Sequence, residues 1–373
     1  MKEFDSLVEL LEDLDREGIT GMQRNSLVRD FLSLKARKKE VPYSGGFELT
    51  PLCNLDCKMC YVHLTQSQMG ETKLLTVAQW IDIMQQAIDA GMMYADITGG
   101  ECLTSPGFKE VYLFLLSRGV RVSILTNGKL LSEEIVEFFK KNRPDGVQVS
   151  LYGSNSEAYR RVTGSDAFDD VISGIRRLKE ANIRVKVSLM THQYMKDDAI
   201  AMLDLVRSLN VEYAIGPSIM DARPDTGRSI DSYGVDEDVY LNMRWNEEAY
   251  RLHIPQPSPP TKEYHATVAA PADQRGLPCS SGKCGFHVNW KGELTPCIPF
   301  YRVNASILDH GFSTAWWIVK EKMKTYHPPA ACQSCQYKSL CTTCPAEKTL
   351  GILNGALNPV VCSRLKKSIN HER

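Results

Sequence analysis

A regular alternation of strand-like and helix-like segments between residues 46 and 219 constrains the fold most strongly. Strands are predicted from runs rich in β-branched and aromatic residues at 47–52, 94–98, 121–126, 147–151, 185–190 and 212–215. Helical periodicity of apolar residues recurs between them, at 76–90, 108–118, 133–141, 169–181 and 197–209. Such alternation is typical of right-handed βα units around a parallel sheet. Six units are too few for a closed eight-stranded barrel, so we predict an α/β fold with a partial (β/α)6 TIM-like barrel; a doubly wound open sheet is the alternative.

The helix at 76–90 carries the clearest local signals. Its apolar residues, among them Trp80 and Met84, fall on one face. Thr76 and Gln79 have the spacing of a capping box, and Gly91 suits the position just past the helix end.

Composition narrows the class of protein. The 373 residues are 43% hydrophobic and 24% charged, which fits one large globular domain plus a smaller one. A net charge of -1 without a long basic run gives no support for a nucleic-acid or membrane-surface partner. The N-terminus lacks the apolar stretch of a signal peptide, so we expect a cytoplasmic protein. In a reducing compartment, twelve cysteines in clusters indicate metal or iron–sulfur ligation rather than disulfides.

Three of these cysteines, Cys53, Cys57 and Cys60, form a C-x-x-x-C-x-x-C run directly after the first predicted strand. Three thiolates on one loop can hold three irons of a cubane cluster and leave the fourth iron open to a ligand. A zinc knuckle or a redox dithiol is the alternative explanation of so short a pattern.

This motif resembles that of the radical S-adenosylmethionine (SAM) superfamily, although the residue before the last cysteine, usually aromatic there, is Met59. The resemblance implies a [4Fe–4S] cluster whose free iron takes the amino and carboxylate groups of SAM. Gly99, Gly100 and Glu101, after the second predicted strand, match the family's Gly-Gly-Glu, which implies that they bind the SAM amino group.

Further cofactor-binding residues follow from the same resemblance. Ser150, at the end of the fourth predicted strand, matches a serine that contacts the SAM carboxylate, and Arg161 is the better spaced of two arginines that could join it. Asn127 is placed to reach substrate or the SAM ribose, although Asn-Gly is first a turn signal. Cys102, where many family members have proline, is a candidate catalytic thiol, with a buried small hydrophobe as the alternative.

The C-terminal cysteines resemble those of a SPASM domain, which carries two auxiliary [4Fe–4S] clusters. The resemblance implies one set of four ligands, Cys279, Cys284, Cys297 and Cys344, and an interleaved second set, Cys332, Cys335, Cys341 and Cys362. The spacing between Cys341 and Cys344 is one residue shorter than usual in the family. A pair of zinc sites is the alternative.

These observations divide the chain into four parts. Residues 1–45 are expected to form an N-terminal helical cap with helices at 4–14 and 22–34, and residues 46–220 the radical SAM partial barrel. A bridging region, 221–278, contains a helical stretch near 236–252 and a proline-rich piece read as a linker. The resemblance implies that residues 279–373 form the small SPASM iron–sulfur domain.

The resemblance implies an enzyme that reductively cleaves SAM to a 5′-deoxyadenosyl radical and abstracts hydrogen from its substrate. We expect a ribosomally made precursor peptide as partner, modified by a crosslink or a related oxidation, and an electron donor such as flavodoxin or ferredoxin. One alternative is a SPASM-type dehydrogenase of a small molecule. An alternative of another class is a zinc-binding scaffold without catalysis.

Overall fold

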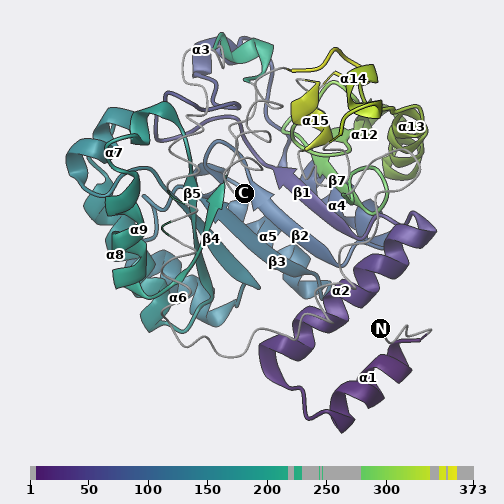
Figure 1. Ribbon diagram of the computed structural model, residues 1–373, viewed down its shortest axis with the longest axis horizontal. Coiled ribbons are helices and arrows are strands. Elements are labelled where there is room, and N and C mark those ends of the chain that lie inside the picture. The colour runs from purple at the N-terminus through teal and green to yellow at the C-terminus, as the bar shows by residue number, and fades with distance from the viewer. Residues whose placement is uncertain are drawn as a thin grey trace.

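In the computed structural model, one curved sheet organises the chain (Figure 1). The structure describes residues 6–216, 222–228, 279–336, 344–349 and 352–358, together with Met243 and Asn246. Nine strands in this described part follow the order β6-β5-β4-β3-β2-β1-β7-β8-β9. Their bounds are β1 Ser44–Glu48, β2 Tyr94–Thr98, β3 Arg121–Thr126, β4 Gly146–Leu151, β5 Val185–Met190, β6 Glu212–Gly216, β7 Gly285–Val288, β8 Glu293–Thr295 and β9 Ala305–Ser306.

The six strands β1 to β6 pair in parallel in sequence order, and a helix follows each of the first five. This arrangement confirms the predicted α/β fold with a partial (β/α)6 barrel. The helices of this region are α3 Gln66–Met69, α4 Val77–Asp89, α5 Phe108–Ser117, α6 Glu133–Lys141, α7 Ser156–Thr163, α8 Phe168–Glu180 and α9 Ala199–Leu209. Figure 1 shows α6 to α9 along one outer side of the sheet and the C-terminal elements beside β1.

The flanking helices lie at the two ends of the chain. The N-terminal pair, α1 Leu7–Arg16 and α2 Gly21–Lys39, lies at the lower right of Figure 1, near β1 and β2. The C-terminal helices, α12 Ile307–His310, α13 Phe312–Lys324, α14 Ala330–Gln333 and α15 Pro345–Lys348, lie at the upper right. None of the helices in the described part of the chain combines the length and apolar character that a bilayer crossing requires.

The two faces of the sheet differ in chemistry. Along β4 and β5 the side chains alternate between fully buried and half-exposed. Val147, Val149 and Val187 belong to the buried set, which forms the main core with the helices. The half-exposed set, on the concave lumenal face, includes Gln148 and Lys186. The period of two therefore puts the core on one side and a polar surface on the other.

The C-terminal region extends the barrel sheet, because β7 pairs in parallel with β1. Two glycines permit this approach: a Cβ on Gly45 would lie 2.3 Å from the Phe286 ring, and one on Gly46 would lie 2.7 Å from His287 Nδ1. The first strand accordingly covers Ser44–Glu48 instead of the predicted 47–52. Strand propensity missed this start because glycine is depleted in strands unless another backbone comes close.

Local signals predicted the other five strands of the barrel and the longer helices up to α9, but not the short helix α3 or the strands and helices after residue 279. The capping box of Thr76 and Gln79 is present at the start of α4. The short helix α7, rich in polar residues, was not predicted. The helical stretch expected near 236–252 lies outside the described residues, apart from Met243 and Asn246.

Candidate active site

The cysteine loop, residues 49–64, leaves the carboxyl end of β1. Cys57 is buried, whereas Cys53 and Cys60 are partly exposed. Burial raises the pKa of the Cys57 thiol, and the neighbouring Cys60 and Cys53 raise it further. Burial also raises the pKa of Cys53, to about 12. Three thiols thus lie within electrostatic reach of one another and keep their protons until a cation or metal displaces them.

The end of α7 supports this loop. The Asp56 amide donates to the Thr163 carbonyl at 3.1 Å, and the Lys58 amide donates to the Val162 carbonyl at 3.0 Å. The last carbonyls of a helix have no partner within the helix, so the loop satisfies them. The unpredicted helix α7 therefore fixes the middle of the cysteine motif.

The Gly-Gly-Glu turn after β2 packs directly against the start of the loop. The Gly100 amide donates to the Thr50 carbonyl at 2.6 Å, and the Glu101 amide donates to the Leu52 carbonyl at 3.0 Å. A Cβ on Gly100 would lie 2.3 Å from the Leu52 carbonyl oxygen. Glycine is therefore required here by a close backbone approach.

The Glu101 carboxylate points into the protein. It is 1% exposed and accepts from Thr126 Oγ1 and the Asn127 amide, both at 2.8 Å, and from the Leu103 amide at 3.1 Å. Burial raises the pKa of Glu101 although these donors oppose the shift. The carboxylate joins the ends of β2 and β3, so the backbone of the turn remains the part of this motif that can meet a ligand ammonium.

Asn127 and Ser150 lie at the same edge of the sheet. Asn127 Nδ2 donates to Asn54 Oδ1 at 2.7 Å and approaches Cys53 Sγ at 3.6 Å, so it ties β3 to the cysteine loop. Ser150 is half-buried on the lumenal face of β4 and hydrogen-bonds to Tyr152.

Two other predicted residues stand apart from the lumen. Cys102 is fully buried, and its thiol donates to the Leu125 carbonyl at 3.3 Å. Burial, reinforced by the Glu101 charge, raises its pKa well above the usual value. Such an environment favours the small-hydrophobe alternative over an ionised nucleophile. Arg161 is exposed on α7, whereas its neighbour Arg160 pairs with Asp166.

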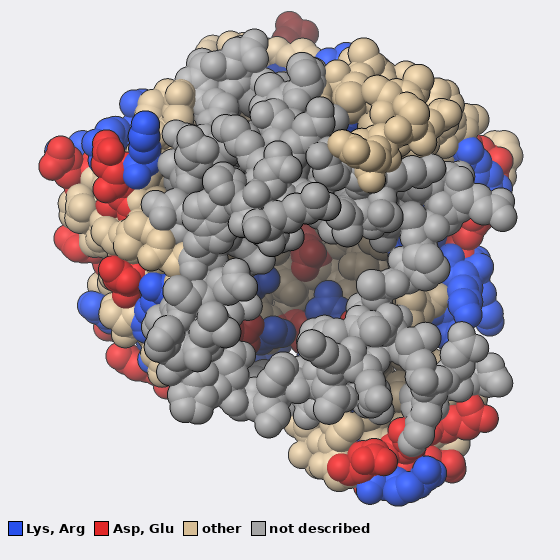
Figure 2. All heavy atoms as spheres, viewed as in Figure 1, with Lys and Arg blue, Asp and Glu red and all other residues tan. Residues whose placement is uncertain are grey.

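Strand register aligns polar residues along the lumenal wall. Gln148 pairs in register with Lys186. Two residues further along each strand, towards the carboxyl edge of the sheet, Ser150 pairs with Ser188. Figure 2 shows acidic and basic atoms inside the hollow of this face. Lys186 forms no ion pair with any described residue. The wall below the cysteine loop therefore offers hydrogen-bonding groups and a cation.

Of the C-terminal cysteines, the structure describes Cys279, Cys284, Cys297, Cys332, Cys335 and Cys344. Cys279 and Cys344 both act electrostatically on Cys297, whose pKa burial raises to about 12. Cys284 interacts with Cys279 but directs its thiol to the Ser33 carbonyl at 3.8 Å. Of the second set, Cys332 and Cys335 lie around the end of α14, whereas Cys341 and Cys362 lie outside the described residues.

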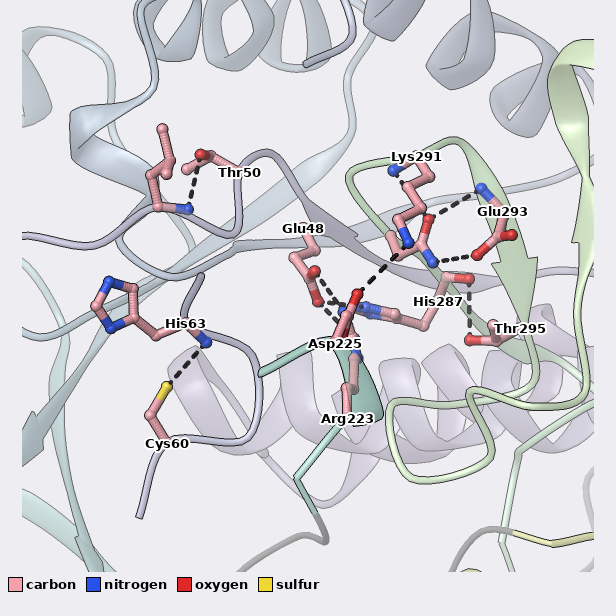
Figure 3. Close-up of polar contacts among 12 residues, drawn as sticks. Glu48, Thr50, Cys60, His63, Arg223, Asp225, His287, Lys291, Glu293 and Thr295 are labelled. Carbon is pink, nitrogen blue, oxygen red and sulfur yellow. Dashed lines mark hydrogen bonds and ion pairs between the residues drawn. The ribbon is translucent and has the colours of Figure 1, made fainter. Parts of the chain in front are cut away.

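A buried ion pair that the sequence reasoning missed lies beside the loop (Figure 3). Arg223 donates to both Glu48 oxygens at 2.7 Å, and His287 Nε2 lies 3.4 Å from Glu48 Oε2. Burial opposes ionisation of Glu48. The charge of Arg223 is the main influence in the other direction, and the net result is a Glu48 pKa of about 2. A carboxylate inside an apolar strand was a usable sequence signal for Glu48, but nothing in the sequence pointed to Arg223.

The described residues contain no group of three or more His, Cys, Asp or Glu side chains that converge on a single metal ion. A cubane cluster instead receives each thiolate on a different iron. The chemistry of the donor set, three thiols on one partly buried loop, fits such a cluster.

Comparisons with known proteins bear on this site. A sequence profile described as "Radical SAM superfamily" matches residues 47–206. The Bacillus subtilis antilisterial bacteriocin subtilosin biosynthesis protein AlbA is 26% identical over 264 residues, covering 70% of this chain but only 56% of AlbA. The Methanosarcina barkeri AdoMet-dependent heme synthase is 25% identical and covers 81% of this chain and 90% of that protein. The crystal structure of Streptococcus suis SuiB bound to precursor peptide SuiA matches with a TM-score of 0.67 at 14% identity, covering 95% of this chain and 87% of that chain, and thus supports the fold.

Proposed function

Because the chain belongs to the radical SAM superfamily, we propose that Cys53, Cys57 and Cys60 hold a [4Fe–4S] cluster with one iron left for SAM. The observation that carries the proposal is the position of the three thiols on one partly buried loop, at the carboxyl edge of a parallel sheet. Ligands bind at this edge in α/β folds. When bound and reduced, the cluster and SAM supply a 5′-deoxyadenosyl radical that abstracts hydrogen from substrate.

The residues of the neighbouring strand ends orient SAM in this proposal. The backbone of Gly99, Gly100 and Glu101 receives its amino group, because the Glu101 carboxylate is already engaged with β3. Ser150 receives its carboxylate, and Asn127 faces the ribose or substrate. Arg161 would have to turn inward from the exposed face of α7 to join Ser150. The protein thus contributes binding and orientation to the chemistry.

We further propose that the C-terminal region holds two auxiliary [4Fe–4S] clusters. Cys279, Cys284, Cys297 and Cys344 would ligate one, and Cys332, Cys335, Cys341 and Cys362 the other. Support comes from the electrostatic proximity of Cys297 to Cys279 and Cys344. Cys284 would have to turn its thiol away from Ser33.

The proposed substrate is a ribosomally made precursor peptide, with a crosslink or related oxidation as the modification. Similarity to a bacteriocin biosynthesis protein supports a peptide. The polar lumenal wall of Gln148, Lys186 and Ser188 suits a peptide, whose backbone is rich in donors and acceptors. An electron donor such as flavodoxin or ferredoxin would reduce the cluster.

Similarity to a heme synthase over 81% of this chain keeps a small-molecule substrate as the second candidate. The polar wall serves either class, so substrate assays must decide between them.

The test is anaerobic reconstitution of the full chain, followed by dithionite and SAM. We expect brown protein with about twelve irons and release of 5′-deoxyadenosine, and no 5′-deoxyadenosine from Cys57→Ala. Colourless, zinc-loaded protein that never releases 5′-deoxyadenosine would refute the enzyme assignment. Mass change in candidate precursor peptides, compared with small metabolites under the same conditions, separates the two substrate classes.

A further inference from the structure

A short segment after β6, residues 222–228, lies between the cysteine loop and the β7–β8 turn; we call it the strap. Its first anchor is Arg223, 7% exposed, whose guanidinium pairs with Glu48 and whose amide donates to the Tyr61 carbonyl at 3.1 Å. A second contact joins Asp225 to Lys291 at 3.5 Å, as Figure 3 shows. The strap therefore connects β1, the cysteine loop and the C-terminal hairpin.

The turn within the strap is closed by the buried Thr226. Its hydroxyl donates to the Arg223 carbonyl at 2.7 Å and accepts from the Arg228 amide at 3.2 Å. Gln68 on α3 donates to the Thr226 carbonyl at 2.9 Å. These contacts fix the direction in which the chain reaches Arg228.

The Arg228 guanidinium, at the far end of the strap, lies against the middle of the cysteine motif. It donates to the Cys57 carbonyl and to the Asp56 carboxylate, and its side chain is 22% exposed. A cation thus lies against the backbone of Cys57, one of the three proposed ligands.

We propose that Arg228 is a positioning residue that holds the cysteine loop in place and sets a positive charge beside the SAM-binding cluster. The inference rests on the proposed function, since it requires a cluster on this loop. A nearby cation stabilises the more negative, reduced state of a cluster, because net charge and surroundings set its potential. Arg228 therefore makes the cluster easier to reduce.

The test compares reconstituted full-length wild type with Arg228→Gln, Arg228→Lys and the control Arg184→Gln. Arg184 forms an ion pair with Glu212 at the opposite end of β5, with both side chains about half-exposed. An EPR-monitored redox titration should give Arg228→Gln a more negative midpoint potential than wild type. Arg228→Lys, which keeps the charge, and Arg184→Gln should remain near wild type.

A second measurement reports the loop without a cluster. In cluster-free reduced protein we expect iodoacetamide to alkylate Cys57 several-fold faster in both Arg228 variants, because lysine cannot reproduce the two-pronged contact. If Arg228→Gln assembles no cluster, the alkylation of Arg228→Lys decides. Cys57 alkylation in Arg228→Lys at the wild-type rate would overturn the proposal.

An unchanged midpoint potential in Arg228→Gln would also overturn it. Wild-type protein that binds no cluster at all would instead refute the proposed function.

Discussion

Gly100 occupies a position where one added methyl group meets the backbone of the cysteine loop. Gly100→Ala would place a Cβ 2.3 Å from the Leu52 carbonyl oxygen. Because neither backbone can move without breaking the Gly100–Thr50 hydrogen bond, we expect a loss of about 1–3 kcal/mol in unfolding free energy. Urea denaturation of the cluster-free protein measures this loss, and iron content after reconstitution should fall with it.

The matched control is Gly146→Ala at the start of β4, where the nearest atom to an added Cβ lies 3.5 Å away. This variant should unfold within about 1 kcal/mol of wild type. Equal stability of the two variants would contradict the assigned close approach.

Glu48 makes a pH-dependent contribution to stability. Its folded pKa, about 2, lies below the ordinary value of 4.5. The contribution is therefore complete above pH 4.5 and is lost as the pH falls from 4.5 towards 2. We expect Glu48→Gln to flatten the fall of unfolding free energy in this window, by on the order of 3 kcal/mol.

The measurement is urea denaturation of cluster-free protein between about pH 5 and about pH 2, the range in which the Glu48 carboxyl titrates. Glu212→Gln removes a carboxylate from a half-exposed ion pair and should change the pH dependence of the unfolding free energy little. Parallel curves for wild type and Glu48→Gln would refute the role of the Arg223 pair.

At the scale of elements, the alternation of side chains along a strand decides which residues face the lumen, where we expect substrate to bind. Lys186 lies on the lumenal face of β5 and pairs in register with Gln148, while its neighbours Val185 and Val187 are buried. We expect Lys186→Met to lower substrate turnover roughly tenfold, the effect of losing one charge-assisted hydrogen bond. SAM cleavage without substrate should stay at the wild-type rate, because Lys186 lies below the proposed SAM contacts.

Lys141→Met, on the exposed end of α6, is the control for a lost lysine. Substrate turnover by Lys186→Met equal to that of Lys141→Met would exclude this face as the substrate wall.

The elements that sequence predicted are those whose signals are local. The helix α4 has its capping box and apolar stripe within fifteen residues, and the order of the strands follows from their alternation with helices. The Gly45–Gly46 start of β1 was missed because its reason lies in Phe286 and His287, far along the chain. Long-range pairing overrides strand propensity there.

In the candidate site, too, the residues with local signals were predicted and those that depend on long-range contacts were not. Cys53, Cys57 and Cys60 were recognised because one loop carries all three thiols. Arg228 was not, because its contact with Cys57 spans 171 positions. The strap falls within the bridging region predicted at 221–278, and composition alone gives no sign that its two arginines contact residues near the start of the barrel.

At the scale of the whole molecule, the barrel and the C-terminal region share one sheet and one core. The ring centroid of Phe286 on β7 lies 5.9 Å from that of Phe47 on β1 and 5.0 Å from that of Phe312 on α13. Since Phe286 is 4% exposed and joins both halves, the two regions should unfold together.

Pulsed alkylation along a urea titration of cluster-free protein tests this coupling. Cys57 reports the barrel and Cys297 reports the C-terminal region, and in wild type both should become reactive at one urea concentration.

Phe286→Ala should lower that concentration for both cysteines, with a loss of about 3–5 kcal/mol in unfolding free energy. Trp317→Ala, at a neighbouring but 58% exposed position of α13, should change stability by less than about 0.5 kcal/mol. Separate transitions for Cys57 and Cys297 in wild type would mean that the continuous sheet does not couple the two halves, because a shared core that is lost in one step must expose both thiols at once.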